Sequence, residues 1–179
     1  MSAEEVLGLV FDLPEEPWVT EIRRLRAAHD HARIGFPVEI TLAGSSGLGW
    51  LSHGQAHYLI AERVRAIARD VVPFTCFFSG VEIFPDSRVY YLAVKDEEPF
   101  HAFQRTLAAS ALQFEPTQFG YKPHCTIAAL PNGVAALACT ELAAFPPPVH
   151  GVTIRSLSLY AVARSRNECR LVWRLPLDA

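Results

Sequence analysis

Apolar and polar positions alternate along the chain in stretches typical of short strands and amphipathic helices. β-Branched apolar runs predict strands, and apolar residues that recur every three or four positions, as Trp18, Ile22 and Leu25 do, predict helices. The expected elements of the first half are a strand Val6–Leu13, a helix from Pro14 to about His29, a strand Val38–Ala43, a helix from about Gln55 to Arg69, and strands Phe74–Ile83 and Arg88–Lys95. The turn Phe84-Pro85-Asp86-Ser87 predicts that the last two strands form a hairpin.

The second half follows a similar order of elements. It predicts a helix from about Pro99 to Leu112, a strand His124–Leu130, a helix from about Val134 to Ala144, and strands Val152–Ala163 and Cys169–Leu175 that turn at Ser165-Arg166-Asn167. We therefore expect an α+β fold with two pseudo-symmetric lobes of antiparallel sheet, flanked by helices around a central groove. Residues 1–179 are interpreted as one domain with lobes of approximately 1–95 and 96–179, between which strands can be exchanged.

Composition narrows the class of protein. The chain has 179 residues, half of them hydrophobic, which suits a single globular domain with a full core. Its formal charge of -3 and pI near 6.1 provide no overall basic field. Avid binding to long duplex nucleic acid is therefore not expected, and a nucleic-acid ligand would be short or bound by its end.

Cysteine usage and the N-terminus bear on the compartment. Cys76, Cys125, Cys139 and Cys169 are widely spaced without a C-x-x-C pair, which favours reduced thiols over a disulfide framework. The N-terminal residues are acidic, unlike a signal peptide, and no apolar run approaches the roughly 20 residues that cross a bilayer. We expect a cytoplasmic protein without a membrane segment.

The segment Tyr121-Lys122-Pro123-His124-Cys125-Thr126-Ile127 carries the clearest candidate chemistry. Side chains two positions apart on a strand share a face, so His124 and Thr126 would stand together. An imidazole transfers protons near neutral pH, and a threonine hydroxyl can hold an anionic oxygen. The pair therefore suits work on a phosphate.

A second segment, Phe36-Pro37-Val38-Glu39-Ile40-Thr41-Leu42, has the same layout in the first half of the chain. Glu39 stands where the layout would place a second histidine, and Thr41 corresponds to Thr126. Taken together, the two segments predict paired strands that line one groove.

Two H-x-T-x strands, one in each half of a chain of this size, are the signature of the 2H phosphoesterase superfamily. This chain resembles its 2'-5' RNA ligase and cyclic phosphodiesterase branch over nearly its whole length, with Glu39 in place of the first motif histidine. The resemblance implies two lobes around a groove, His124 as a catalytic acid or base, and Thr41 and Thr126 as phosphate-holding residues. It also implies action without a metal or other cofactor on 2',3'-cyclic phosphates or 2'-5' linkages of RNA or nucleotides.

The glutamate poses an electrostatic problem. At about 5 Å and an effective dielectric constant of about 20, an ionised Glu39 would repel a phosphate charge by roughly 3 kcal/mol, a hundredfold loss of affinity. A raised pKa, a cation such as Lys122 or Arg33, or a ligand that is uncharged at this point would offset the repulsion. A protonated Glu39 would serve as acid with His124 as base, and an ionised Glu39 would serve as base with His124 as acid. A groove that has kept its shape and lost its reaction is the third alternative.

Residues next to the two motif strands are further candidates for contacts with a ligand in the groove. Lys122, Tyr121, Arg33 and Phe36 lie next to the motif strands and are candidate groove contacts, the aromatic rings as stacking surfaces for a base. His53 and His57 lack a third ligand at a characteristic spacing, so we predict no metal site. The leading hypothesis is an enzyme whose partner is a small nucleotide or RNA end. The alternatives are a noncatalytic nucleotide or RNA-end binding protein and a scaffold whose groove binds another protein.

Overall fold

The structure is a computed structural model and describes residues 5–133, 135–163 and 167–177. Its elements in chain order are β1 (Glu5–Asp12), α1 (Pro17–His29), the 3-10 helix η1 (His31–Arg33), β2 (Glu39–Ala43), α2 (His57–Ala68), β3 (Phe74–Cys76), β4 (Phe78–Ile83), β5 (Val89–Val94), α3 (Glu98–Ala108), β6 (His124–Ala129), α4 (Ala136–Ala143), β7 (Val152–Ile154), β8 (Ser156–Ala163) and β9 (Glu168–Pro176).

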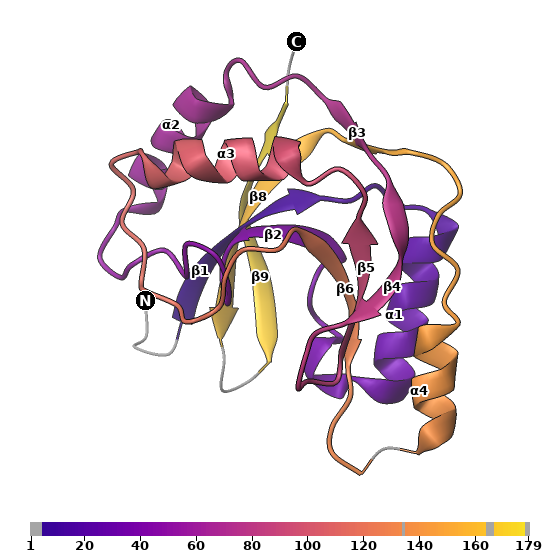
Figure 1. The fold of residues 1–179 in the computed structure, drawn as a ribbon. Coiled ribbons are helices and arrows are strands. Elements are labelled where there is room, and N and C mark those ends of the chain that lie inside the picture. Colours follow the sequence, from indigo (N-terminus) through magenta and orange to yellow (C-terminus); the bar gives the residue numbers. More distant parts are fainter. Residues whose placement is uncertain (1–4, 134, 164–166, 178–179) are drawn as a thin grey trace.

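The described strands form three antiparallel groups (Figure 1). A four-stranded sheet has the order β2-β1-β8-β9, a three-stranded sheet has the order β4-β5-β6, and β3 pairs with β7. The helices α1 and α4 pack against β6 and β4, whereas α3 packs against β2 and α2 contacts α3 and β9. The predicted α+β architecture of antiparallel sheets flanked by helices is thus confirmed.

The four-stranded and the three-stranded sheet each combine strands from both halves of the sequence. In the four-stranded sheet, β1 and β2 come from the start of the chain and β8 and β9 from its end, and β1 pairs with β8 from Glu5↔Ala163 to Phe11↔Leu157. Helix α1 likewise packs on β6, which lies a hundred residues later in the chain. The division into lobes of approximately 1–95 and 96–179 stays a prediction.

Two predicted strands are wrong as single elements. The stretch Phe74–Ile83 divides at Phe77, because β3 pairs with β7 whereas β4 pairs with β5. The stretch Val152–Ala163 divides at Arg155, whose carbonyl accepts a hydrogen bond from Leu177 N at 2.8 Å. In both places β-favouring residues run on without a break, and only the choice of partner strand divides them.

The hairpin between β4 and β5 is confirmed, and its turn contains Asp86 at a positive φ of 54°, a conformation that aspartate tolerates. The second predicted turn includes residues 165 and 166, which lie outside the described residues, and the strands on either side of it, β8 and β9, pair as expected.

The core is centred on β1, which is buried on both faces between β2 and β8. Phe11 at its end packs edge-to-face on Phe74, Phe100 and Phe103, at centroid distances of 5.5, 5.6 and 5.2 Å. This cluster ties β1 to β3 and α3, so residues from both halves of the sequence bury one another.

Cys76 and Cys125 are buried and Cys139 and Cys169 are partly buried, and all four thiols are free. Among the described helices, none combines the length and the apolar character that a membrane span requires.

Candidate functional site

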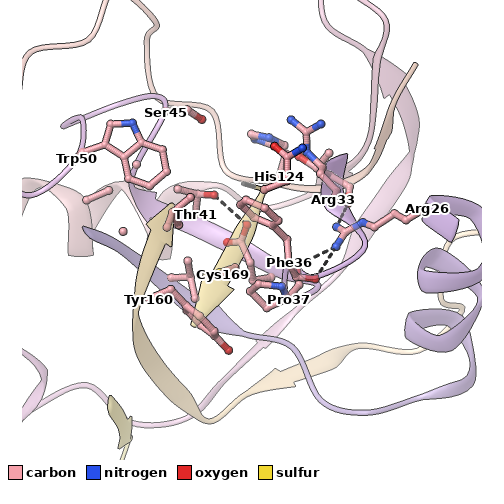
Figure 2. Close-up of a pocket in the computed structure, with 18 residues that line it drawn as sticks. Arg26, Arg33, Phe36, Pro37, Thr41, Ser45, Trp50, His124, Tyr160 and Cys169 are labelled. Carbon is pink, nitrogen blue, oxygen red and sulfur yellow. Dashed lines mark hydrogen bonds between the residues drawn. The ribbon is translucent and has the colours of Figure 1, made fainter. Parts of the chain in front are cut away.

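A pocket of about 270 Å³ lies between the two motif strands (Figure 2). Strand β2 contributes Glu39 and Thr41, and β6 contributes His124 and Thr126. The alternate residues of the two strands, Ile40, Cys125 and Ile127, are fully buried in the core, as the two-residue period of a strand requires. The structure therefore brings together the four residues that the paired segments single out.

His124 is held in one orientation by its neighbours. Its Nδ1 lies 2.6 Å from the carbonyl oxygen of Lys122, and its ring meets those of Phe84 and Tyr91 edge-on at centroid distances of 4.8 and 5.2 Å. A carbonyl can only accept, so Nδ1 carries the proton and the lone pair of the neutral ring is on Nε2. Burial lowers the pKa of His124 below its usual 6.5, so the ring is mostly neutral at pH 7 and Nε2 is free of a proton.

The pKa of Glu39 is shifted upward, opposite to that of His124. Its Oε1 accepts a hydrogen bond from Thr41 Oγ1 at 3.0 Å, whereas Oε2 is closed off from solvent and has no partner among the described residues. Burial raises the pKa of Glu39 to about 7, against the Thr41 hydrogen bond and the charges of Arg26 and Arg33, which favour the carboxylate. Glu39 thus carries a proton for much of the time near neutral pH.

The two threonines differ in what they can offer a ligand. The hydroxyl of Thr41 is engaged by Glu39, and the hydroxyl of Thr126 has no hydrogen-bond partner within the described part of the chain. Thr126 faces both the pocket between the motif strands and a second one beside it. It is therefore the better placed of the two to bind an oxygen directly.

The second pocket has a volume of about 420 Å³ and shares Arg33, Ser45, His124 and Thr126 with the first. Its other walls include Phe84, Phe119 and Lys122. The Nζ of Lys122 donates to Glu97 Oε1 at 2.8 Å. The two pockets thus meet at His124 and Thr126, and Phe84 and Phe119 are aromatic parts of the wall of the second.

The candidate groove contacts separate into three cases. Arg33 and Phe36 line the pocket between the motif strands (Figure 2), and Lys122 lines the second pocket. Tyr121 lines neither: its ring packs edge-on against His101 at 5.3 Å and its hydroxyl is buried without a partner among the described residues. Stacking of Tyr121 on a base finds no support in this arrangement, because Tyr121 lines neither pocket.

Several lining residues escaped the sequence interpretation: Arg26, Ser45, Trp50, Tyr160 and Cys169. Gly44 and Ser45, in the glycine-rich turn that follows β2, form part of the pocket wall. That turn does not lead directly into a helix, because α2 begins only at His57. Trp50, Tyr160 and Cys169 carried no local signal, since only the fold brings their segments to β2.

The described residues contain no group of three or more histidine, cysteine, aspartate or glutamate side chains arranged to hold a metal. His53, weighed above as a ligand, has Nε2 at 3.5 Å from Glu115 Oε1 instead. Among the side chains that line the pocket, His124 and Glu39 are able to accept and donate protons near neutral pH.

Comparison with known protein families finds a match over most of the chain. Residues 13–166 match the sequence model of a family described as the 2'-5' RNA ligase superfamily. No curated protein matches the chain.

Solved structures match over the whole chain. E. coli LigT complexed with 3'-AMP is 22% identical, with a TM-score of 0.57 over 98% of this chain and 99% of that chain. E. coli LigT complexed with NADP+ is 23% identical, with a TM-score of 0.55 over 99% and 100% of the two chains. Usb1 of Kluyveromyces marxianus is 10% identical, with a TM-score of 0.53 over all of both chains. At these identities the likeness establishes a shared fold.

Proposed function

This chain belongs to the 2'-5' RNA ligase superfamily, and we propose that it hydrolyses 2',3'-cyclic phosphodiesters of nucleotides or RNA ends, with His124 as base and Glu39 as acid. One observation carries the proposal: a neutral histidine with a free Nε2 and a carboxyl group whose pKa is about 7 line the same pocket. Of the two assignments open from the sequence, these protonation states favour Glu39 as the acid.

The reaction follows from these two states. His124 Nε2 takes a proton from water as the water oxygen attacks phosphorus, and the bond from phosphorus to one ribose oxygen breaks. Glu39 supplies the proton that this oxygen needs in order to leave. Arg33 and Thr126 face the space where the non-bridging oxygens would lie. The imidazolium and the carboxylate then exchange protons with solvent, which restores the starting states.

The proton of Glu39 has a specific route in this proposal. Because Oε2 is enclosed, the accessible path runs from Oε1 to the hydroxyl of Thr41, 3.0 Å away. When Oε1 carries the proton, this hydrogen bond runs from the Glu39 carboxyl to Thr41 Oγ1, which leaves the single hydroxyl hydrogen of Thr41 free for the leaving oxygen. Thr41 can then accept the proton of Glu39 while it passes its own on, and so acts as a relay.

The pH dependence of the purified chain tests the assignment. We expect kcat/KM for 2',3'-cyclic nucleotides to be bell-shaped, with an acid limb below pH 6.5 from His124 and an alkaline limb near pH 7 from Glu39. The measurement is initial rates from pH 5 to 9 with chelator present. Activity that rises steadily to pH 9, or that disappears with chelator, would contradict the proposal.

The relay is tested at Thr41 alone. We expect Thr41→Val to lower kcat by about a hundredfold, the scale of one acid or base contribution, and Thr41→Ser to retain most of the activity. Serine keeps the hydroxyl and valine keeps the shape, so the pair separates chemistry from packing. Equal rates for the two variants would rule out the relay.

Because Oε2 of Glu39 is closed off from solvent, it cannot pass a proton directly to a ligand. This favours a second candidate, a noncatalytic nucleotide or RNA-end binding protein on the same fold. E. coli LigT has been solved in complex with 3'-AMP, ATP and NADP+, which makes nucleotides the first ligands to test on this chain. Calorimetric binding of 3'-AMP without turnover of any cyclic nucleotide would support this candidate.

A further inference from the structure

Arg26 lies beneath the pocket with 3% of its surface exposed, although it carries a charge. It extends from α1 toward the two motif strands (Figure 2). Its guanidinium group donates hydrogen bonds to four backbone carbonyl oxygens: Phe36 at 3.0 Å, Pro37 at 2.9 Å, Thr126 at 2.6 Å and Ile127 at 3.0 Å. Two of these oxygens belong to the segment that leads into β2, and two belong to β6.

These bonds connect strands that do not otherwise form one sheet. β2 is an edge of the four-stranded sheet and β6 an edge of the three-stranded sheet. The planar guanidinium, with five N–H donors in a fixed fork, joins the start of β2 to the middle of β6. Arg26 thus links the segment that carries Glu39 and Thr41 to the strand that carries His124 and Thr126.

The charge of Arg26 is not matched by an ion pair. Within the described part of the chain no carboxylate forms a salt bridge with it, because the nearby Asp30 accepts hydrogen bonds from Arg33 at 3.1 Å and from the amide of Ala129 at 2.6 Å. A guanidinium stays protonated even when buried, so a net positive charge remains under the pocket.

We propose that Arg26 is a positioning residue that fixes the spacing of the two motif strands and whose unpaired charge favours both a bound phosphate and the ionised form of Glu39. This role rests on the proposed function, since it serves a reaction between the strands. The titratable and charged groups that act on Glu39 come from several elements, and they are Arg26 (α1), Arg33 (η1), Asp12 (β1), Tyr121 (before β6), Cys125 and His124 (β6) and Cys169 (β9). Of these, Arg26 alone also bonds the backbone of both motif segments among the described hydrogen bonds.

Two substitutions separate spacing from charge. Arg26→Lys keeps the charge but cannot bridge four carbonyls, so we expect faster hydrogen exchange at amides of β2 and β6 and an unchanged Glu39 titration. Arg26→Gln removes the charge as well, so we expect the Glu39 carboxyl carbon, followed by NMR, to titrate about one pH unit higher than in the wild type. The alkaline limb of activity should move with it, and kcat should fall by about tenfold in both variants.

Arg24 on the same helix provides the matched control, because it is exposed and, among the described residues, its side chain bonds to Glu21 and Glu141 alone. Arg24→Lys and Arg24→Gln should leave the titration, the exchange rates and kcat as they are. A folded Arg26→Gln variant with wild-type titration and wild-type exchange in β2 and β6 would overturn the proposal. The Glu39 titration and the hydrogen-exchange rates can both be measured on an inactive protein. An inactive wild type would therefore refute the proposed function and still leave the role of Arg26 tested.

The wild-type chain decides the matter should neither variant fold. The Nε–H resonance of Arg26 is then expected to be protected from solvent exchange and to shift when inorganic phosphate is added. A resonance that exchanges rapidly and ignores phosphate would overturn the proposal.

Discussion

We expect His124→Ala to lower kcat for 2',3'-cyclic nucleotides by about a thousandfold, with a much smaller change in KM. The substitution removes the base that accepts the water proton but leaves Arg33 and Thr126, which face the phosphate position, in place. The fold should persist, since alanine at this position leaves the backbone pairing of β6 with β5 unchanged. Steady-state rates and circular dichroism on the same preparations measure both effects.

His31→Ala is the matched control for this experiment. His31 is exposed on η1 and lines neither pocket, yet it is the imidazole in the sequence nearest to Glu39. The variant should retain wild-type activity. Equal losses at His31 and His124 would mean that another residue supplies the base, and no loss at His124 would remove the catalytic assignment altogether.

The motif residues were accessible to sequence analysis because each pair is local. Two positions on one strand determine which side chains share a face, so Glu39 could be paired with Thr41, and His124 with Thr126, before any tertiary contact was known. Their protonation states were not accessible, because these depend on burial among residues from other segments. The sequence left two acid-base assignments open, and the burial of Glu39 and His124 favours one of them.

Arg26 illustrates a signal that was present and easily overlooked. It falls four positions after Ile22 and seven after Val19, both buried, so a charged residue occupies the apolar face of α1. An arginine at such a position either reaches solvent or finds buried acceptors, and here the acceptors are carbonyls of segments ten and a hundred residues away. Only the tertiary fold identifies them.

The sequence predicted β3 with β4, and β7 with β8, as single strands. These two predictions are wrong for a related reason. Strand propensity is a local property, whereas membership of a sheet depends on pairing between distant segments. Phe77 and Arg155 mark the points at which the chain passes from one pairing to another. Neither residue is a proline or glycine, so nothing in the local sequence announces the change.

The largest effect besides that of His124 should come from Glu39→Gln, which keeps the shape of the side chain and removes its acidic proton. We expect kcat for 2',3'-cyclic nucleotides to fall by about a hundredfold, because a ribose oxygen leaves poorly without protonation. A p-nitrophenyl phosphodiester has a leaving group that needs no proton, so its hydrolysis should fall only slightly. A large, equal loss on both substrates would instead identify Glu39 as the base.

The same substitution has a consequence for stability that does not depend on turnover. Between pH 4.5 and about 7 the unfolded chain has already released the Glu39 proton while the folded chain retains it, so the free energy of unfolding falls as the pH rises through this range. A difference of this size in pKa corresponds to about 3 kcal/mol above pH 7. Glu39→Gln should remove that cost and unfold at higher urea concentration than the wild type at pH 8, but not at pH 4.5.

Glu62→Gln, a change of the same kind at an exposed position of α2, should leave both midpoints unchanged. If both Gln variants unfold at the wild-type urea midpoint at pH 8, the Glu39 carboxylate is ionised in the folded chain without a cost in stability. In that case Glu39 could not hold a proton at neutral pH, and the acid in the proposed reaction would have to be sought elsewhere. A stabilised but less active Glu39→Gln variant would instead show that the fold tolerates a costly buried carboxyl at the position where the reaction needs an acid.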